Sequence, residues 1–216
     1  MKLLFLCKTN DEYSLRALEH CKSRFEEVVA FKGDWGEKLP EECLAWRGDL
    51  IISYLSRWII PDTMIANASL AAINFHAGSP NYPGYGPINF ALYENATEYG
   101  STCHFMLPKV DTGPIIDTEK IPVLPGDDVE ALLARTYVAQ YTLFERVIDR
   151  LLTEKELSPN GEQWARRPFT RKELNQMMII EPDMSKDEVG KRIRAGTFRQ
   201  FKPYVEIHGY RFELAG

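Results

Sequence analysis

The sequence predicts an α/β protein, in which a mostly parallel sheet flanked by helices is followed by a small C-terminal extension with two short helices and a β-hairpin. Three observations favour it. Short apolar runs recur at intervals long enough to hold a helix, as parallel strands with crossover helices do. Residues 127–151 carry apolar side chains at helical spacing. After residue 157 the sequence becomes polar and Pro/Gly-rich, so we place a main domain over 1–157 and the extension over 158–216.

Four apolar runs are the predicted parallel strands, and they occupy residues 2–7, 28–31, 50–55 and 71–75. Between the first two runs, apolar residues return every three or four positions, which predicts a helix. These residues are Leu15, Leu18, Cys21 and Phe25. Such strands, with helices on both faces of the sheet, predict a Rossmann-like arrangement.

The later elements follow in order. Residues 100–106 and 115–121 have strand character, and the long helix after Asp127 closes the main domain. In the extension, two capping-box patterns, Thr170 with Glu173 and Ser185 with Glu188, each predict the start of a short helix. The chain then alternates apolar and polar residues over 204–207 and 210–214 around His208-Gly209, which predicts a hairpin.

The composition excludes several classes of protein. With 44% hydrophobic and 26% charged residues it is that of an average soluble domain, and no stretch approaches the roughly 20 apolar residues of a membrane span. The apolar start is followed at once by Lys8 and lacks a small-residue cleavage site, which indicates a buried strand rather than a signal peptide. We therefore expect a soluble protein with no membrane partner.

The cysteines and histidines indicate neither disulfides nor a metal. The four cysteines include no Cys-x-x-Cys pair, and the four histidines form no cluster at ligand spacing. We expect a reducing, cytoplasmic location and no metal site.

The charge is unevenly distributed. Residues 160–216 hold 11 basic and 8 acidic side chains, whereas the residues before them hold 15 and 23. An acidic body disfavours nucleic acid as a partner. A slightly basic tail is ordinarily a solvated face, and it could also attract a phosphate-bearing substrate.

The most informative segment begins with Asn74 and His76 and continues into a loop rich in Pro, Gly and Tyr. If residues 71–75 form a parallel strand, both side chains point the same way at its carboxyl end. Open α/β sheets hold their ligand sites at that edge. Asp111 lies in a turn sequence between two later strands, so an amide, an imidazole and a carboxylate could converge on one pocket.

Each of these residues alone has an ordinary structural explanation. An Asn at a strand end caps a loop, a lone His forms structural hydrogen bonds, and an Asp in Asp-Thr-Gly forms a turn. Their order and spacing together carry the functional prediction.

Asn-x-His at residues 74–76, the Pro/Gly-rich loop and Asp-x-Gly-Pro at residues 111–114 resemble the folate-dependent formyltransferase family over roughly residues 45–120. The resemblance implies an N10-formyltetrahydrofolate-dependent N-formyltransferase with Asn74, His76 and Asp111 as its catalytic residues. Asn74 would donate to the developing oxyanion, and His76 would add a second donor or a proton. Asp111 would hold the imidazole and accept protons from the attacking amine.

The resemblance also implies where the ligands lie. The pterin would rest against residues 54–60 and 106–110, with contacts from Tyr54, Leu55, Ile60, Met106 and Val110. We assign Thr9, Asn10 and Tyr85 to the second substrate. His104 is assigned to the core or to a neighbouring polar group rather than to catalysis.

Departures within the family select the substrate. The loop after the first strand, residues 8–12, is not the phosphate loop of glycinamide ribonucleotide transformylase, and the tail is too short for the barrel domain of the methionyl-tRNA enzyme. The tail and His-x-x-x-Pro-x-Tyr-Pro-Gly at residues 76–84 resemble the bacterial sugar N-formyltransferases, nearest the branch that acts on GDP-perosamine. We predict formylation of the amine of a nucleotide-linked amino-dideoxy sugar in surface-polysaccharide (lipopolysaccharide) synthesis.

Three alternatives stay open. They are a formyltetrahydrofolate hydrolase, a methionyl-tRNA formyltransferase-like enzyme and a non-catalytic nucleotide-binding module. The terminal hairpin, residues 204–214, has a strongly apolar face that two strands cannot bury alone. It either folds back on its own domain or forms a homodimer, and the resemblance to the sugar enzymes favours the homodimer.

Overall fold

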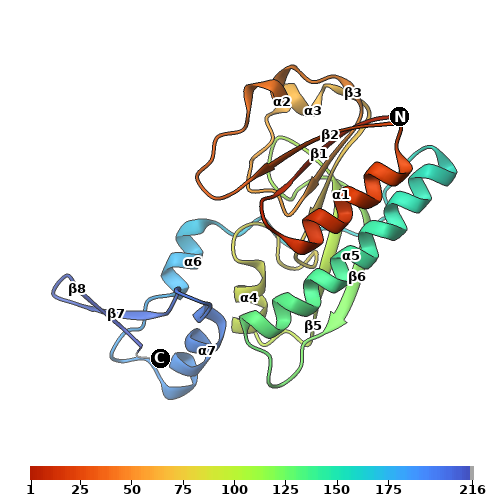
Figure 1. Ribbon diagram of the computed structural model, residues 1–216. Coiled ribbons are helices and arrows are strands. Elements are labelled where there is room, and N and C mark those ends of the chain that lie inside the picture. The colour runs from red at the N-terminus through yellow and green to blue at the C-terminus, as the bar shows by residue number, and fades with distance from the viewer. Residues whose placement is uncertain (215–216) are drawn as a thin grey trace.

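The computed structural model describes residues 1–214, which form a six-stranded mixed sheet flanked by helices and a separate two-stranded hairpin (Figure 1). The strands are β1 (Lys2–Lys8), β2 (Glu27–Gly33), β3 (Gly48–Tyr54), β4 (Ala68–His76), β5 (Glu98–Phe105), β6 (Ile115–Pro122), β7 (Tyr204–Ile207) and β8 (Tyr210–Glu213). The helices are α1 (Glu12–Arg24), α2 (Glu41–Ala45), α3 (Asp62–Ile65), α4 (Pro87–Tyr93), α5 (Val129–Glu154), α6 (Arg171–Met177) and α7 (Lys186–Gly196). The predicted fold class is confirmed.

The sheet changes direction at β4. Its order is β2-β1-β3-β4-β5-β6, in which the first four strands are parallel and β5 and β6 pair antiparallel. A parallel crossover needs about a dozen residues or more, and the short connection over residues 106–114 allows only the antiparallel pairing of β5 with β6. The carboxyl end of β4 therefore lies beside β5, at the boundary between the two halves of the sheet.

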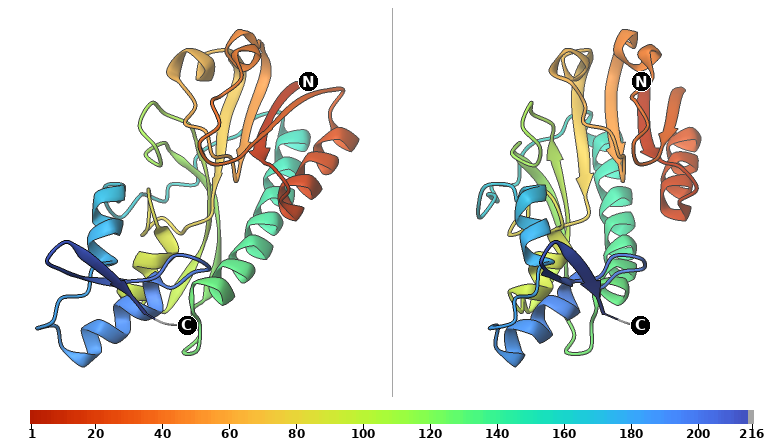
Figure 2. Two further views of the ribbon diagram at one scale, coloured as in Figure 1. Left: turned by 60° about the vertical axis from the view of Figure 1, so that its left-hand side comes forward. Right: turned by 90° about the vertical axis from the view of Figure 1, so that its left-hand side faces the viewer.

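Alternation along the strands supplies a core on each face. In β1, Leu3 and Phe5 pack into a layer with residues of α1 and α5. Leu4 and Leu6 point to the other face and join Cys43 of α2 in a second layer with α3. Helices thus cover both faces of the sheet, with α1 and α5 side by side on one of them (Figure 2).

The extension packs on the main domain. A third hydrophobic cluster combines residues of α4 and α5 with Phe169, Met177 and Ala195. The rings of Phe90 and Phe169 stack with their centroids 3.7 Å apart. Figure 1 shows α6 and α7 lying next to α4. Residues on both sides of residue 157 share this core. The division into two domains there stays a prediction.

One of the two predicted capping boxes forms. Thr170 and Glu173 exchange both bonds at the start of α6. At α7 the Ser185 side chain accepts from the Glu188 N–H, but the Glu188 carboxylate bonds the Tyr93 hydroxyl at 2.7 Å and Arg192 at 2.6 Å. The second box is therefore only half formed, because the Glu188 carboxylate is bonded to Tyr93 of α4 and to Arg192 of its own helix instead of to the N-cap backbone.

The hairpin β7–β8 projects from the body (Figure 1). Its base is held where Tyr204 exchanges backbone bonds with Met178 and Ile180. Towards its tip, Tyr210 is 72% and Phe212 56% exposed. Tyr210 and Phe212 are thus largely in solvent, whereas Tyr204 and Val205 at the base are half-buried.

Two further properties concern residues 1–214. No helix among them is both long and apolar enough to cross a membrane. All four cysteines are buried and free.

Candidate active site

The end of β4 carries the first two site residues. Asn74 and His76 share one face of the strand because side chains alternate with a period of two. His76 is buried and Asn74 half-buried. Tyr82, in the loop after β4, accepts a hydrogen bond from His76 Nε2 through its backbone carbonyl at 3.0 Å.

His104 joins them from β5. It pairs with Asn74 in the antiparallel register, and its Nε2 lies 3.1 Å from Asn74 Nδ2. Its Nδ1 lies 2.8 Å from the Phe105 carbonyl oxygen. The prediction left His104 in the core or with a polar neighbour. The structure buries it among the site residues.

Asp111 is the carboxylate between the two imidazoles. One oxygen lies 3.3 Å from His76 Nδ1 and the other 3.3 Å from His104 Nε2. The Gly84 N–H donates to the carboxylate at 2.8 Å. Asp111 is buried and has a φ of 47°, a left-handed conformation that Asp tolerates better than most residues. Asn74, His76, His104 and Asp111 thus form one cluster, which we call the Asp111 cluster.

Two opposing effects set the charge of Asp111. Burial raises the pKa of a carboxyl because it disfavours the charged form. The imidazoles of His76 and His104 and the Gly84 N–H outweigh burial and lower the pKa of Asp111 to about 2. The carboxylate is therefore ionised at neutral pH.

The partners of the imidazoles fix where their protons lie. Because a carbonyl oxygen only accepts, His76 donates from Nε2 and His104 from Nδ1. The other nitrogen of each ring faces Asp111 and binds the carboxylate only when it carries a proton. The cluster can therefore hold an additional proton beside a fixed negative charge.

The five predicted folate residues differ in how far the structure exposes them. Tyr54 lies wholly in the aromatic core against Phe75, so its side chain is not accessible from the surface. Ile60 is buried on the face of the sheet that α2 and α3 cover. Leu55 is half-buried with a φ of 53°, Met106 is half-buried, and Val110 is 44% exposed. A ligand could contact the last three directly and Tyr54 only through its backbone.

The predicted substrate residues lie on two loops. Thr9 and Asn10 follow β1, whose carboxyl end lies on the same edge of the sheet as that of β4. Tyr85 is 40% exposed, and the Arg171 guanidinium lies 5.9 Å from the centre of its ring. Contacts from these three residues to a ligand stay predictions.

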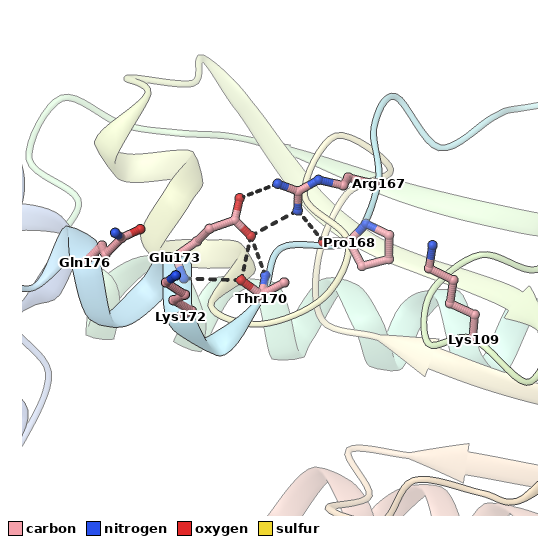
Figure 3. Close-up of a pocket in the computed structure, with 7 residues that line it drawn as sticks. All are labelled: Lys109, Arg167, Pro168, Thr170, Lys172, Glu173 and Gln176. Carbon is pink, nitrogen blue, oxygen red and sulfur yellow. Dashed lines mark hydrogen bonds and ion pairs between the residues drawn. The ribbon is translucent and has the colours of Figure 1, made fainter.

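A basic pocket of about 520 Å³ adjoins the loop that carries Asp111 (Figure 3). Lys109 lines one side and Arg167 and Lys172 the other. Arg167 is bonded to the Glu173 carboxylate at 2.7 and 3.0 Å. The two lysines have no ion-pair partner within the described part of the chain.

Sequence reasoning missed Trp164, whose indole touches both site imidazoles. Its one local signal is an aromatic residue in an otherwise polar segment.

Comparisons with known proteins agree on one family. A model of the family Formyl transferase matches residues 19–148. A methionyl-tRNA formyltransferase of Listeria innocua is 35% identical over 89 residues, which are 41% of this chain and 28% of that protein. One of Limosilactobacillus fermentum is 26% identical over 147 residues, 68% of this chain and 46% of that protein. The chain thus spans less than half the length of these curated relatives.

Solved structures share the fold along nearly the whole chain. A sugar N-formyltransferase from a Shewanella species has a TM-score of 0.81 and 15% identity, and the match covers 99% of this chain and 96% of that one. A 4-N formyltransferase from Francisella tularensis has a TM-score of 0.80 and 20% identity with the same coverage. An N-formyltransferase from Helicobacter canadensis, solved with folinic acid and dTDP-3-aminofucose, has a TM-score of 0.75 and 21% identity, covering 98% of this chain and 86% of that one.

Proposed function

The chain belongs to the formyl transferase family, and on that premise we propose that it transfers a formyl group from N10-formyltetrahydrofolate to the amine of a nucleotide-linked amino-dideoxy sugar. The observation that carries this proposal is the Asp111 cluster. An amide, two imidazoles and an ionised carboxylate meet at the carboxyl end of β4.

The residue types suit acyl transfer to an amine. As the amine adds to the formyl carbon, negative charge develops on the formyl oxygen, and Asn74 and His76 are the donors placed to stabilise it. In this structure His76 Nε2 already donates to the Tyr82 carbonyl. Donation from that nitrogen to a substrate would therefore require this bond to be exchanged.

The reaction must also move protons. The attacking amine loses one proton, the bond from the formyl carbon to N10 breaks, and N10 takes up a proton as tetrahydrofolate leaves. A carboxyl with a pKa of about 2 is a weak base by itself. A proton that reaches Asp111 can instead be held at an imidazole nitrogen 3.3 Å away. Because its pKa is low, Asp111 is better suited to holding and orienting the two imidazoles than to accepting a proton itself.

The folate donor would lie beside the cluster. Leu55, Met106 and Val110 offer accessible apolar side chains for a flat ring, and the backbone of 106–110 leads directly to Asp111. The solved Helicobacter canadensis enzyme binds folinic acid, a formylated folate, which supports a folate donor for this chain.

Two features favour a nucleotide-linked sugar as the acceptor. The matches to solved sugar N-formyltransferases extend through the C-terminal extension, whereas the methionyl-tRNA enzymes match only part of their own length. In addition, the basic pocket adjoins the loop that carries Asp111 and presents Lys109 and Lys172, which have no ion-pair partner among residues 1–214 and suit a diphosphate.

A tRNA acceptor is the second candidate, because the curated sequence relatives are methionyl-tRNA formyltransferases. The acidic body of the chain counts against it, since nucleic-acid binding is dominated by cationic contacts to phosphate.

One experiment separates the candidates. The purified protein is given N10-formyltetrahydrofolate with a nucleotide-linked amino sugar, with methionyl-tRNA or with no acceptor, and release of tetrahydrofolate is followed. Release that depends on the sugar supports the proposal. Release with tRNA alone establishes the second candidate, release without any acceptor establishes a hydrolase, and folate binding without release leaves a non-catalytic module.

The same proposal includes a homodimer formed by the hairpin β7–β8. The exposed apolar side chains there are Ile207, Tyr210, Phe212 and Leu214. Two strands do not bury such a face alone, and a second copy would cover it with the same face by twofold symmetry. A cytoplasmic location and a role in surface-polysaccharide synthesis also belong to the proposal and depend on the acceptor.

A further inference from the structure

The segment from 158 to 169, which we call the strap, ties the two loops of the site together. It crosses from the end of α5 to α6 (Figure 2). Its Ala165 N–H donates to the Pro80 carbonyl in the loop after His76 at 3.1 Å. Its Asn160 N–H donates to the Ile115 carbonyl, just after the Asp111 loop, at 2.9 Å. The strap is thus fastened on both sides of the Asp111 cluster.

Trp164 is the strap residue that reaches the cluster. Its ring centroid lies 5.1 Å from that of His104 with an interplanar angle of 82°, and 6.0 Å from that of His76 with an angle of 70°. Both values fall in the range of favourable edge-to-face aromatic contacts. One indole therefore packs against both imidazoles at once.

A hydrogen bond fixes the indole in this place. Trp164 Nε1 donates to the Gly113 carbonyl at 2.8 Å, two residues after Asp111. A side chain at Gly113 would meet the Phe105 carbonyl oxygen, so the backbone there is closely packed against β5. The indole is thus bound to the Asp111 loop while its ring rests on the histidines.

We propose that Trp164 is a positioning residue that holds the rings of His76 and His104 at the angles at which each faces one oxygen of Asp111. Each imidazole has one hydrogen bond to a backbone carbonyl, about which the ring could still tilt. A rigid ring against both of them removes that freedom. Misplacement of a catalytic group by about 1 Å can cost on the order of a hundredfold in rate. Trp164 lies outside residues 19–148, so the family match does not include it.

The expected effect of Trp164 on turnover rests on the proposed function. Its expected effect on the orientation of the His76 and His104 rings does not. The test compares Trp164→Phe, which keeps a ring against the imidazoles, with Trp164→Met, which keeps apolar bulk without a ring. Trp46→Met is the matched control, because Trp46 is a buried indole packed under the sheet with α2 and α3, away from the cluster.

The first measurement is ¹⁵N NMR of the histidine side chains in the ligand-free protein. In the wild type, His76 should show a proton on Nε2 and His104 one on Nδ1, both slow to exchange. Trp164→Met should shift these signals and speed their exchange, whereas Trp164→Phe and Trp46→Met should leave them close to wild type. Unchanged ring signals in Trp164→Met would overturn the proposal whether or not the protein transfers a formyl group.

The second measurement is the steady-state rate of formyl transfer. Trp164→Met should lower kcat at least about tenfold with little change in KM for either substrate, and Trp164→Phe should recover most of that loss. If the Met and Phe variants lose kcat equally, ring packing is not what positions the histidines. A wild type without turnover would count against the proposed function alone, since the NMR comparison still decides the role of Trp164.

Discussion

The Asp111 cluster and the terminal hairpin are opposites in burial and in partners. In the cluster, polar groups are buried or half-buried and meet one another or a backbone group. In the hairpin, Tyr210 and Phe212 are mostly exposed, and the neighbours that the strand pairing gives them are Ile207 and Val205 of the other strand. Burial of polar groups is costly unless they are paired, and exposure of a large apolar face is unfavourable until it is covered. The first region thus pairs its polar groups within one chain, and the second presents an apolar face that the proposed homodimer would cover.

Removing a hydrogen-bond donor from the Asp111 cluster should have the largest effect on turnover. We expect Asn74→Ala and His76→Ala each to lower kcat on the order of a hundredfold or more, because each loses a donor to the developing oxyanion. Steady-state kinetics and thermal unfolding measure turnover and fold separately. Asn67→Ala, just before the amino end of the same strand, is the control and should keep its kcat. Near-normal turnover in either site variant would remove that residue from the proposed machinery.

Lowering the pH should reduce the free energy of unfolding of the wild type more than that of Asp111→Asn. The pKa of Asp111 is lowered from 3.8 to about 2 on folding, so the ionised carboxylate stabilises the folded state at pH values above about 4. That contribution is lost as the pH falls from about 4 to about 2, and it is on the order of 2 kcal/mol. Urea unfolding at pH 5 and pH 3 should show a smaller loss of stability in Asp111→Asn. An equal loss in both proteins would show that the carboxylate is not stabilised by its neighbours.

The basic pocket beside the cluster should contribute to binding rather than to the chemical step. We expect Lys172→Gln to raise the KM for a nucleotide-linked amino sugar about fivefold, the equivalent of about 1 kcal/mol, with kcat and the KM for the folate unchanged. Lys186→Gln, an exposed lysine on α7, is the control. A rise in the folate KM instead would assign the pocket to the glutamate end of the donor.

The hairpin should have the smallest effect on turnover and a large effect on assembly. Phe212→Lys places a charge in its apolar face, so light scattering should show a dimer converted to a monomer while kcat stays the same. Val138→Lys changes an equally exposed apolar residue on α5 and should leave the dimer intact. A wild type already monomeric at micromolar concentration would remove the dimer from the proposal.

Much of the fold follows from local pattern. Each predicted strand forms, because apolar alternation in a strand such as β1 is set by which face each residue must bury. The convergence of Asn74, His76 and Asp111 was also predictable, since a strand end and a nearby turn bring them to one edge. The predicted ligand contacts depend on side-chain direction, which local pattern does not determine. The prediction for Tyr54 was drawn from its place at the end of β3, which does not give the direction of its side chain, and that side chain packs into the core.

Long-range contacts account for what the sequence did not predict. His104 meets Asn74 only because β5 pairs antiparallel with β4, a register that no local pattern specifies. Trp164 lies 51 residues from Gly113, to which it bonds, and no periodicity connects the two. Glu188 leaves its predicted cap for Tyr93, 95 residues away. In each case a tertiary partner determined where the side chain went.

The transfer of a labelled formyl group tests the central claim most directly. The protein is mixed in a single turnover with N10-formyltetrahydrofolate carrying a ¹³C formyl group and a nucleotide-linked amino sugar, and the sugar is analysed by mass spectrometry. The account predicts that the label appears on the sugar with the wild type and not with Asp111→Asn, while calorimetry shows that both proteins still bind a non-reactive folate analogue. Label on the sugar at equal rates in both proteins would contradict the role of the Asp111 cluster, and label released as free formate would contradict transfer to an amine.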